Sequence, residues 1–313
     1  MARALVFPGQ GSQAVGMGKD LYDAFSSARE VFQEVDDALG QNLSNLMFEG
    51  PEDDLTLTEN AQPALMTVSL AAMAVLKSEG GFDLSTSADF VAGHSLGEYS
   101  ALAAAGTFSL ADTARLLKLR GQSMQQAVPV GEGAMAALLG LDLDATKEVV
   151  ETAAEGEVLA TANDNAPGQV VVSGKTSAVE RAVEVAKENG AKRAMLLQVS
   201  APFHCPMMAP AADVMAKALS EVEVSAPVVP LIANVTAAPV SDPAEIQRLL
   251  VEQVTGMVRW RESVETMKSK GVETLVEVGS GKVLSGLTRR IDRELTSANV
   301  GSPADVEAFL ASL

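Results

Sequence analysis

The sequence contains few of the residues that build metal centres and disulfides. Its 313 residues include one cysteine, Cys205, and two histidines, His94 and His204. A single cysteine excludes an intrachain disulfide and is typical of a reducing compartment. No spacing of Cys, His and Asp matches a metal site. Only two histidines are therefore candidates for a general base, and the residues around each of them help to decide between the two.

Long apolar runs and net positive charge are also missing. Although 47% of the residues are hydrophobic, no stretch approaches the ~20 uninterrupted apolar residues that span a bilayer. The amino terminus runs from a strand-like segment into Pro8-Gly9-Gln10-Gly11 and lacks the regions of a signal peptide. We therefore expect a soluble, cytoplasmic protein with no membrane partner. The formal net charge of −18 argues against a nucleic-acid partner, because such binding depends on neutralised phosphates.

The charge is unevenly distributed along the chain. Residues 29–60 contain nine Asp or Glu against one Arg, whereas residues 259–293 contain eight Lys or Arg against five acids. The second stretch is therefore net positive in an acidic chain. It fits either an ordinary solvated helix face or a local docking patch for an acidic partner, and both interpretations stay open.

The most informative segment is Gly93-His94-Ser95-Leu96-Gly97. An apolar run precedes it, and an alanine-rich stretch that reads as a helix follows it. A serine with glycine two residues to either side, between a strand and a helix, is typical of a nucleophile elbow. The glycines permit a turn that is too tight for a β-carbon, and the helix amino terminus can stabilise developing negative charge. Ser95 is therefore the predicted nucleophile.

A serine hydroxyl needs a neighbouring base to become a good nucleophile. His94 is adjacent to Ser95, so its side chain should diverge from the serine and support the turn instead. His204 lies in the proline-flanked segment Ala201–Pro206, and loops of this kind often hold active-site groups. His204 is the predicted base. Cys205 beside it is interpreted as a small packed residue, since consecutive side chains rarely face each other.

Apolar runs alternate with helical periodicity along most of the chain, which predicts an α/β fold with a largely parallel sheet. Pro63 is expected in the first turn of its helix, where its missing N–H costs least. The segment Gly279–Val283 lacks the leading glycine and the Ser or Thr of a phosphate-binding loop. The predicted strands of the main sheet are residues 4–7, 90–92, 229–233 and 274–277, and the predicted packing helices are residues 61–79, 110–128 and 243–254.

Residues 131–199 show a different order of elements. They read as strand, helix, strand, strand, helix and strand, with Asp144 and Ser177 as plausible helix caps and a hairpin turn at residues 164–168. This βαββαβ order is the ferredoxin-like motif. We therefore predict a discontinuous large domain of residues 1–129 and 200–313, with a small subdomain of residues 130–199 inserted into it. The six segments are residues 134–139, 144–155, 158–163, 169–173, 177–189 and 194–199.

Several sequence strings occur together in this chain. They are Phe7-Pro8-Gly9-Gln10-Gly11-Ser12-Gln13, Gly93-His94-Ser95-Leu96-Gly97-Glu98-Tyr99, Leu116-Leu117-Lys118-Leu119-Arg120-Gly121, Pro202-Phe203-His204 and residues 277–284. Together they resemble the malonyl-CoA:acyl carrier protein transacylases of dissociated fatty acid synthesis, over essentially the whole chain. The resemblance implies an α/β-hydrolase-like main domain with a ferredoxin-like insert. No neighbouring ketosynthase, carrier or linker sequence is present, so we expect a free-standing enzyme.

The same resemblance implies a role for each matching residue. Ser95 would be the acylated nucleophile, and His204 its general base and then its general acid. The backbone N–H groups of Gln10 and Leu96 would form the oxyanion hole. Arg120 would bind the malonyl carboxylate, for which a planar, permanently charged guanidinium is well suited.

Two further residues take their roles from the resemblance. The backbone carbonyl of Gln253 would orient His204, in the place where hydrolases use an aspartate. Phe203 would select malonyl over methylmalonyl groups by filling the space of the α-methyl branch, a preference worth ~1–3 kcal/mol. Arg120 lies on a segment that is otherwise apolar around it, which predicts a partly buried charge; an ordinary surface arginine is the alternative.

The predicted function is transfer of a malonyl group from malonyl-CoA to the phosphopantetheine thiol of acyl carrier protein, through a malonyl-seryl intermediate. We expect a monomer that needs no metal or cofactor. The alternatives are a trans-acting acyltransferase of a polyketide pathway, a serine carboxylesterase, and a non-catalytic carrier-binding module. The carrier would dock on a basic patch, unless its arginines pair with internal acids such as Asp292 and Glu294. The proposed patch residues are Lys282, Arg289, Arg290 and Arg293.

Overall fold

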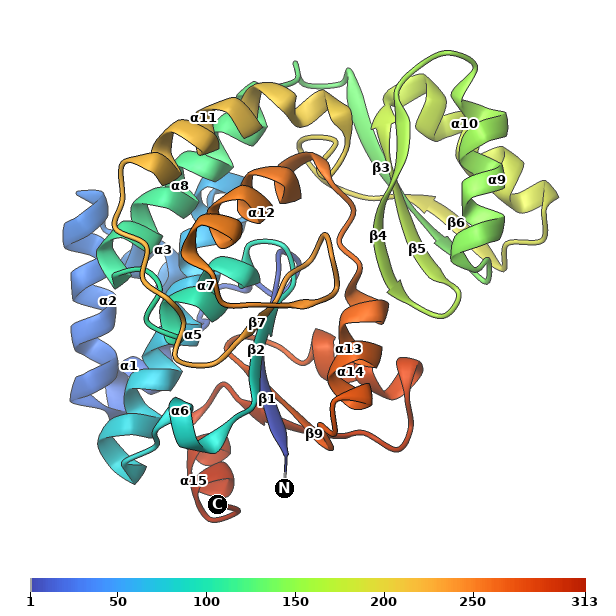
Figure 1. Ribbon diagram of the computed structural model, residues 1–313. Helices are drawn as coiled ribbons and strands as arrows, with labels where there is room; N and C mark the ends of the chain where they lie inside the picture. The colour runs from blue at the N-terminus through green and yellow to red at the C-terminus, as the bar shows by residue number, and fades with distance from the viewer. Residues whose placement is uncertain (1) are drawn as a thin grey trace.

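The computed structural model describes residues 2–313 and contains two β-sheets. The main sheet has six strands in the order β10-β9-β1-β2-β7-β8. Its first five strands run parallel and only β8 is antiparallel to its neighbour, which confirms the predicted α/β class (Figure 1). The strands are β1 Arg3–Phe7, β2 Phe90–Gly93, β7 Leu231–Ile232, β8 Pro239–Val240, β9 Thr274–Val278 and β10 Thr296–Val300.

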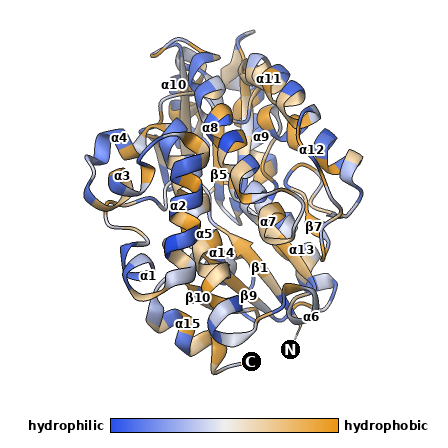
Figure 2. Ribbon diagram, turned by 90° about the vertical axis from the view of Figure 1, so that its left-hand side faces the viewer, coloured by the Kyte–Doolittle hydropathy of each residue, from blue (hydrophilic) through white to orange (hydrophobic). Residues whose placement is uncertain are grey.

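The central strand β1 is buried on both faces, as expected for a parallel sheet covered by helices. Successive side chains of a strand point to opposite faces. Leu5 and Phe7 accordingly pack with α2, α5 and α8, while Ala4 and Val6 pack with α13 and α14. Figure 2 shows strand β1 in hydrophobic colours, and helix α2 with residues of mixed character. The sheet thus forms the middle layer between two groups of helices.

The helices surrounding the main sheet supply most of its cover. The described helices of this part are α1 Lys19–Ala24, α2 Ser26–Leu39, α3 Leu43–Glu49, α4 Glu52–Thr56, α5 Thr58–Gly80, α6 Leu84–Ser87, α7 Gly97–Ala104, α8 Leu110–Gln126, the 3-10 turn η1 Pro206–Met208, α11 Ala209–Ser220, α12 Pro243–Thr255, α13 Trp260–Ser269, α14 Val283–Ile291 and α15 Pro303–Leu310. Within residues 2–313, no helix is long and apolar enough to cross a membrane.

The central helix α5 differs from the sequence prediction at its start. It begins at Thr58, so Pro63 lies inside the helix and not in its first turn, and that prediction was wrong. The sequence misled because the added turn begins with the polar residues Thr58, Glu59 and Asn60, of which Thr58 and Asn60 are nonetheless buried. Thr67 Oγ1 donates a hydrogen bond of 2.7 Å to the carbonyl of Pro63 within the helix.

Three other differences concern the strands of the main sheet. The strand predicted at residues 229–233 is only two residues long, and the sequence analysis did not identify β8 or β10. The sequence of β10, Thr-Ser-Ala-Asn-Val, has no apolar run because it forms the sheet edge and pairs with β9 alone. A polar edge strand carries little of the hydrophobic signal on which strand prediction depends.

The small sheet confirms the predicted βαββαβ order. Its strands lie in the order β4-β5-β3-β6, and all neighbours are antiparallel. Helices α9 and α10 pack together beside this sheet (Figure 1). The elements are β3 Gly133–Leu139, α9 Leu143–Ala154, β4 Leu159–Ala166, β5 Gln169–Lys175, α10 Thr176–Glu188 and β6 Arg193–Leu196.

The two predicted helix caps of the small sheet were wrong. Asp142, not Asp144, caps α9 by accepting a hydrogen bond of 2.8 Å from the amide of Ala145. Both aspartates precede the periodic segment, so the sequence alone could not decide between them. Ser177 does not cap α10; its hydroxyl donates to Glu157 at 2.7 Å. The hairpin turn is also shorter than predicted, because β4 continues through Ala166.

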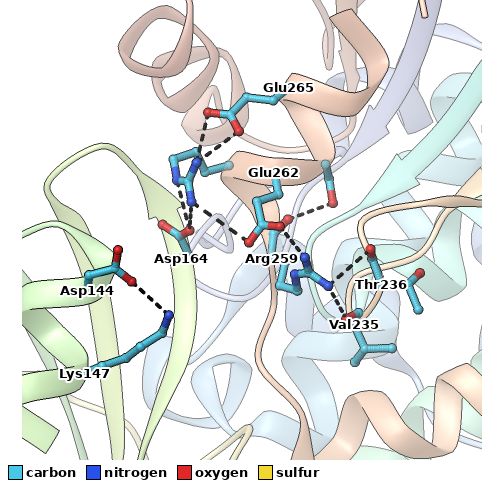
Figure 3. Close-up of polar contacts among 10 residues, drawn as sticks. Asp144, Lys147, Asp164, Val235, Thr236, Arg259, Glu262 and Glu265 are labelled. Carbon is cyan, nitrogen blue, oxygen red and sulfur yellow. Dashed lines mark hydrogen bonds and ion pairs between the residues drawn. The ribbon is translucent and has the colours of Figure 1, made fainter. Parts of the chain in front are cut away.

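Strand β4 is tied to the main part of the molecule by backbone and side-chain contacts. The amide of Asp164 donates to the carbonyl of Val258 at 2.9 Å, and the amide of Val258 donates to Ala162 at 2.8 Å. The carboxylate of Asp164 is 1% exposed and lies 2.8 Å from the guanidinium of Arg261, which also pairs with Glu265 (Figure 3). These contacts fix the small sheet against α13.

Candidate functional site

Ser95 lies in the sharp turn between β2 and α7. Its φ is 55°, a left-handed conformation that is unusual for a residue with a side chain. A β-carbon on Gly93 would come within 1.9 Å of the backbone of Gly97, and one on Gly97 within 2.2 Å of the carbonyl oxygen of Phe7. Both glycines are therefore required for space. The turn presents Ser95 to the pocket at the carboxyl end of the sheet.

The structure brings His204 to Ser95. The Oγ atom of Ser95 lies 2.8 Å from Nε2 of His204. The other ring nitrogen, Nδ1, lies 2.9 Å from the carbonyl oxygen of Gln253 and 3.2 Å from that of Gly256. Carbonyl oxygens only accept, so Nδ1 carries the proton and Nε2 offers its lone pair to the serine hydroxyl. Burial, followed by the charge of Arg120, lowers the pKa of His204 to about 3, which keeps the imidazole neutral and able to accept a proton.

Arg120 projects from α8 toward the same serine. Its side chain is only 1% exposed, so the surface-arginine interpretation is wrong. The guanidinium donates hydrogen bonds to Gln62 Oε1 at 2.8 Å, to Gln253 Oε1 at 2.9 Å and to Ser95 Oγ at 3.2 Å. These acceptors are all neutral. A buried guanidinium with neutral partners retains a strong attraction for an incoming carboxylate.

A buried polar network that the sequence analysis did not identify holds the elbow in place. Asn234 Oδ1 accepts from the amide of Ser95 at 2.8 Å, and its Nδ2 donates to the carbonyl of Gly93 at 2.7 Å. The Oε2 atom of Glu98 accepts from Gln253 Nε2 at 2.8 Å and from the amide of Asn234 at 3.2 Å. The sequence does show an acidic residue, Glu98, in an otherwise apolar helix after the elbow, and this could have identified it as a buried functional group. No feature of the sequence around Asn234 marks that residue.

A pocket of about 370 Å³ opens above Ser95 between the two sheets. Gln10 and Leu96 both line it, and within residues 2–313 their amides donate no recorded hydrogen bond. Phe203 lies in its wall and is 9% exposed. The pocket is thus built jointly from the elbow, from the loop after β1 and from the small sheet. Lining residues include Arg120, Met124, Met135, Asn165, Gln169 and Leu287.

His94 and Cys205 lie close to the site without joining the Ser95–His204 pair. His94 Nε2 lies 2.8 Å from Asn165 Oδ1, so its recorded partner is the β4 hairpin and not Ser95. This is consistent with a supporting role for His94. The thiol of Cys205 is buried and donates to the carbonyl of Pro202 at 3.1 Å, and burial raises its pKa. Cys205 is accordingly a packed residue rather than a nucleophile.

The predicted basic patch lies on and beside α14. Lys282, Arg289, Arg290 and Arg293 are all exposed. Arg290 donates a hydrogen bond of 2.6 Å to Gln169, which itself lines the pocket. Residues Val283, Leu284 and Leu287 of the same helix also line the pocket. The patch therefore adjoins the pocket.

Asp292 and Glu294, the two acids named as alternative partners of these arginines, do not pair with them. Both carboxylates instead pair with Lys268, at 2.7 Å for Glu294. The part of the chain that the structure describes contains no cluster of three or more His, Cys, Asp and Glu side chains arranged to hold a metal ion.

Comparisons with known proteins extend over the whole chain. A family model described as an acyl transferase domain matches residues 4–306. The malonyl CoA-acyl carrier protein transacylase of Bacillus subtilis is 47% identical over 311 residues, covering 99% of this chain and 96% of the relative. The crystal structure of an acyl-carrier-protein-S-malonyltransferase from Bartonella henselae is 58% identical, with a TM-score of 0.98 over 100% of this chain and 99% of that one.

A third comparison concerns a complex. A malonyl-transacylase solved in complex with a type II polyketide synthase acyl carrier protein is 42% identical to this chain. Its TM-score is 0.96, and the match covers 100% of both chains. Both sheets and the pocket between them thus lie within the region of similarity.

Proposed function

The chain belongs to the acyl transferase domain family, and on that premise we propose that it carries the transferred malonyl group covalently on Ser95. The activity is malonyl transfer from malonyl-CoA to an acyl carrier protein in fatty acid synthesis. One observation carries the proposed mechanism: Ser95 Oγ lies 2.8 Å from the neutral imidazole of His204 and 3.2 Å from the guanidinium of Arg120. A base and a carboxylate receptor therefore both contact the nucleophilic oxygen.

In the proposed mechanism, His204 accepts the Ser95 proton as Oγ attacks the thioester carbonyl. The amides of Gln10 and Leu96 stabilise the resulting oxyanion, a contribution of ~3–4 kcal/mol per donor. The tetrahedral intermediate collapses, and the CoA sulfur leaves with the proton from His204. The carrier thiol then gives its proton to His204 and attacks the malonyl ester. The second tetrahedral intermediate collapses, and Ser95 Oγ leaves with that proton returned from His204.

Arg120 binds the malonyl carboxylate in this mechanism. Its charge is the second cause, after burial, of the low pKa of His204. A carboxylate bound to Arg120 neutralises that charge and raises the pKa of His204, which makes the imidazole a stronger base. Binding of the malonyl group therefore increases the basicity of the histidine that catalyses its transfer.

Gln253 supports this chemistry from a fully buried position, and Phe203 from the pocket wall. The backbone carbonyl of Gln253 holds the protonated Nδ1 of His204 and so aims Nε2 at Ser95. Phe203 lines the pocket beside the nucleophile and would clash with an α-methyl branch on the acyl group. We expect malonyl transfer to exceed methylmalonyl transfer on this account.

Acyl carrier protein is the expected second substrate, and we propose that it docks on the α14 patch of Lys282, Arg289, Arg290 and Arg293. The pocket-lining residues of α14 connect this exposed patch to Ser95. The acidic carrier and an enzyme of net charge −18 repel at long range, so a local positive surface is needed for productive encounter.

The remaining proposals concern organisation. All elements of the small sheet fall between Gly133 and Leu196, which supports a subdomain of residues 130–199 inserted into a domain of residues 1–129 and 200–313. The chain supplies nucleophile, base and oxyanion donors itself, so we expect transfer without a metal or cofactor. A monomer in the cytoplasm, where a free thiol such as Cys205 stays reduced, is the expected state.

Incubation with radiolabelled malonyl-CoA tests the proposal. Label should become stably attached to Ser95 and be discharged by added carrier protein. The Ser95→Ala variant should remain unlabelled, while Ser12→Ala, which removes another pocket-lining hydroxyl, should still be labelled. Rapid release of free malonate would indicate an esterase, and binding of carrier without any label would indicate a non-catalytic module.

A further inference from the structure

Glu98 is a buried carboxyl group three residues after the nucleophile, and its backbone amide donates to the carbonyl of Ser95 at 3.0 Å. It lies in the first turn of α7 and is 1% exposed. The hydrogen bonds that it accepts come from neutral donors, the Gln253 amide at 2.8 Å and the backbone amide of Asn234 at 3.2 Å. Removing a carboxylate from water is costly unless an opposite charge compensates it. The role of Glu98 therefore depends on which positive charge compensates its carboxylate.

The compensating charge is Arg120, which acts through the side chain of Gln253. The Gln253 amide accepts from the Arg120 guanidinium at 2.9 Å through Oε1 and donates to Glu98 at 2.8 Å through Nε2. A guanidinium can only donate, so this orientation of the amide is fixed. Arg120 and Glu98 therefore lie at opposite ends of one amide. In a buried environment their charges interact strongly across it.

Few other charges face Glu98. Its own helix contributes Tyr99, whose hydroxyl is buried and whose pKa burial raises to about 12. The nearby His204 donates from Nδ1 to the backbone carbonyl of Gln253. Both are neutral at working pH. Helix α7 packs against β1, β2, α5 and α8. The charged residues of β1 and α5, and those of α8 other than Arg120, are partly or fully exposed: Arg3, Glu59, Lys77, Glu79, Asp112, Arg115 and Lys118.

We propose that Glu98 is the counter-ion of Arg120 in the empty site and that it takes up a proton from solvent when a malonyl carboxylate binds to Arg120. This inference rests on the proposed function, because it requires the malonyl group to pair with Arg120. In the empty site the positive charge of Arg120 and the negative charge of Glu98 cancel. When a second carboxylate enters, protonation of Glu98 restores the balance. The buried site thereby stays neutral in both states, with Gln253 as the connection.

The titration behaviour of Glu98 supports this geometry. Burial raises the pKa of Glu98 to about 7, while the hydrogen bonds from Gln253 and Asn234 and the charge of Arg120 oppose that rise. A malonyl carboxylate on Arg120 cancels the favourable charge and adds an unfavourable one, so it raises the pKa of Glu98 further. Affinity for the malonyl group should therefore be highest below pH 7 and fall as the pH rises through 7. An acetyl group should show no such dependence.

Titration calorimetry on the Ser95→Ala enzyme tests the inference, because this variant binds acyl-CoA without turnover. Malonyl-CoA is titrated at pH 8 in two buffers of different ionisation enthalpy, with acetyl-CoA as the control ligand. We expect uptake of up to one proton with malonyl-CoA and none with acetyl-CoA. The dissociation constant of malonyl-CoA should rise by up to ~10-fold between pH 7 and pH 8, the limit for one linked proton.

Two second-site variants locate the proton. Adding Glu98→Gln to Ser95→Ala keeps an oxygen acceptor for Asn234 and Gln253 but should abolish both the uptake and the pH dependence. Adding Glu252→Gln, which removes an exposed carboxylate beside Gln253 on α12, should leave both unchanged. A merely structural role for Glu98 would alter stability without removing the pH dependence.

Difference infrared spectroscopy gives a readout that leaves Glu98 in place, should the Glu98→Gln variant not fold. A protonated carboxyl band should appear when malonyl-CoA binds to the Ser95→Ala enzyme, and acetyl-CoA should not produce it. Preference for malonyl-CoA without proton uptake would overturn this inference and leave the proposed function intact. Equal binding of malonyl-CoA and acetyl-CoA would overturn both, and uptake that persists in the Glu98→Gln variant would assign the proton to another group.

Discussion

Arg120 is 1% exposed and donates to neutral oxygens beside Ser95, whereas Arg289 and Arg290 lie on the exposed side of α14. The three side chains carry the same charge. Water and salt screen the exposed pair, so their interactions are weak and reversible. Arg120 is almost fully shielded from solvent, so its charge lowers the pKa of His204. The side-chain amide of Gln253 links it to Glu98. The buried guanidinium can therefore bind a carboxylate selectively, whereas the exposed guanidinium groups are suited to transient binding of a partner protein.

The largest effect should follow from removing the atom on which the buried groups converge. Ser95→Ala should reduce malonyl transfer by ~10⁴-fold or more, because no other group can carry the acyl intermediate. The fold and the binding of CoA should persist, which thermal unfolding and calorimetry can check. In the unaltered enzyme, initial rates should give parallel double-reciprocal lines for malonyl-CoA and carrier protein. Intersecting lines would contradict the covalent route.

A smaller but diagnostic effect should appear in the pH dependence of acylation. The buried imidazole must be neutral to act as base, so the rate should fall as the pH drops through the pKa of His204 in the enzyme–substrate complex. A malonyl carboxylate neutralises Arg120 and raises that pKa, whereas an acetyl group does not. Single-turnover acylation at saturating substrate should therefore lose activity at a higher pH with malonyl-CoA than with acetyl-CoA. Superimposable acidic limbs would show that Arg120 does not tune the base.

The exposed arginines should affect encounter and leave chemistry nearly unchanged. Reversal of charge at Arg289 and Arg290, each to Glu, should raise the KM for carrier protein by about 10-fold at low ionic strength. Malonyl loading from CoA should stay nearly intact, and the difference should shrink as salt is added. A matched reversal at Arg248, an exposed arginine that pairs with Glu245 and Glu252 on α12, serves as the control. An unchanged carrier KM would place the docking surface elsewhere.

The smallest effects should come from ion pairs outside the site, and they show the same contrast. Arg261→Met leaves the buried carboxylate of Asp164 without its partner and should cost about 3 kcal/mol of unfolding free energy. Lys147→Met removes the partner of Asp144, which is 89% exposed, and should cost less than ~0.5 kcal/mol. Figure 3 shows both carboxylates. Chemical denaturation measures the two values, and equal losses would mean that burial does not distinguish the pairs.

The features that the sequence predicted well are local ones. The elbow could be predicted because Gly93 and Gly97 flank Ser95 within one turn, and each is required by a close backbone approach. The small sheet could be predicted because its six elements follow one another without interruption. The pair Ser95–His204 was predictable despite its separation, since the chain offers only two histidines.

The features that were missed depend on contacts between distant segments. Glu98 and Gln253 are 155 residues apart, and Asn234 reaches Ser95 across 139 positions. Nothing near Asn234 in the sequence marks it as the residue that holds the elbow. The interior position of Pro63 was missed for a related reason, because the turn before it is polar in sequence although Thr58 and Asn60 are buried by packing. Polar side chains that are buried by contacts between distant segments produce no periodic hydrophobic pattern in the sequence.

The central claim is that the buried Arg120 selects the malonyl group, and the acyl preference of the Arg120→Ala variant tests it most directly. The measurement is the ratio of kcat/KM for malonyl-CoA to that for acetyl-CoA, in the unaltered enzyme and in the variant. Ser95, His204 and the oxyanion amides remain in the variant, so acetyl transfer should be retained or rise. Malonyl transfer should fall by ~10²-fold or more, the loss of a buried charge-assisted pair. Equal losses for both acyl groups would contradict the account, since Arg120 would then support the structure of the site and not its selectivity.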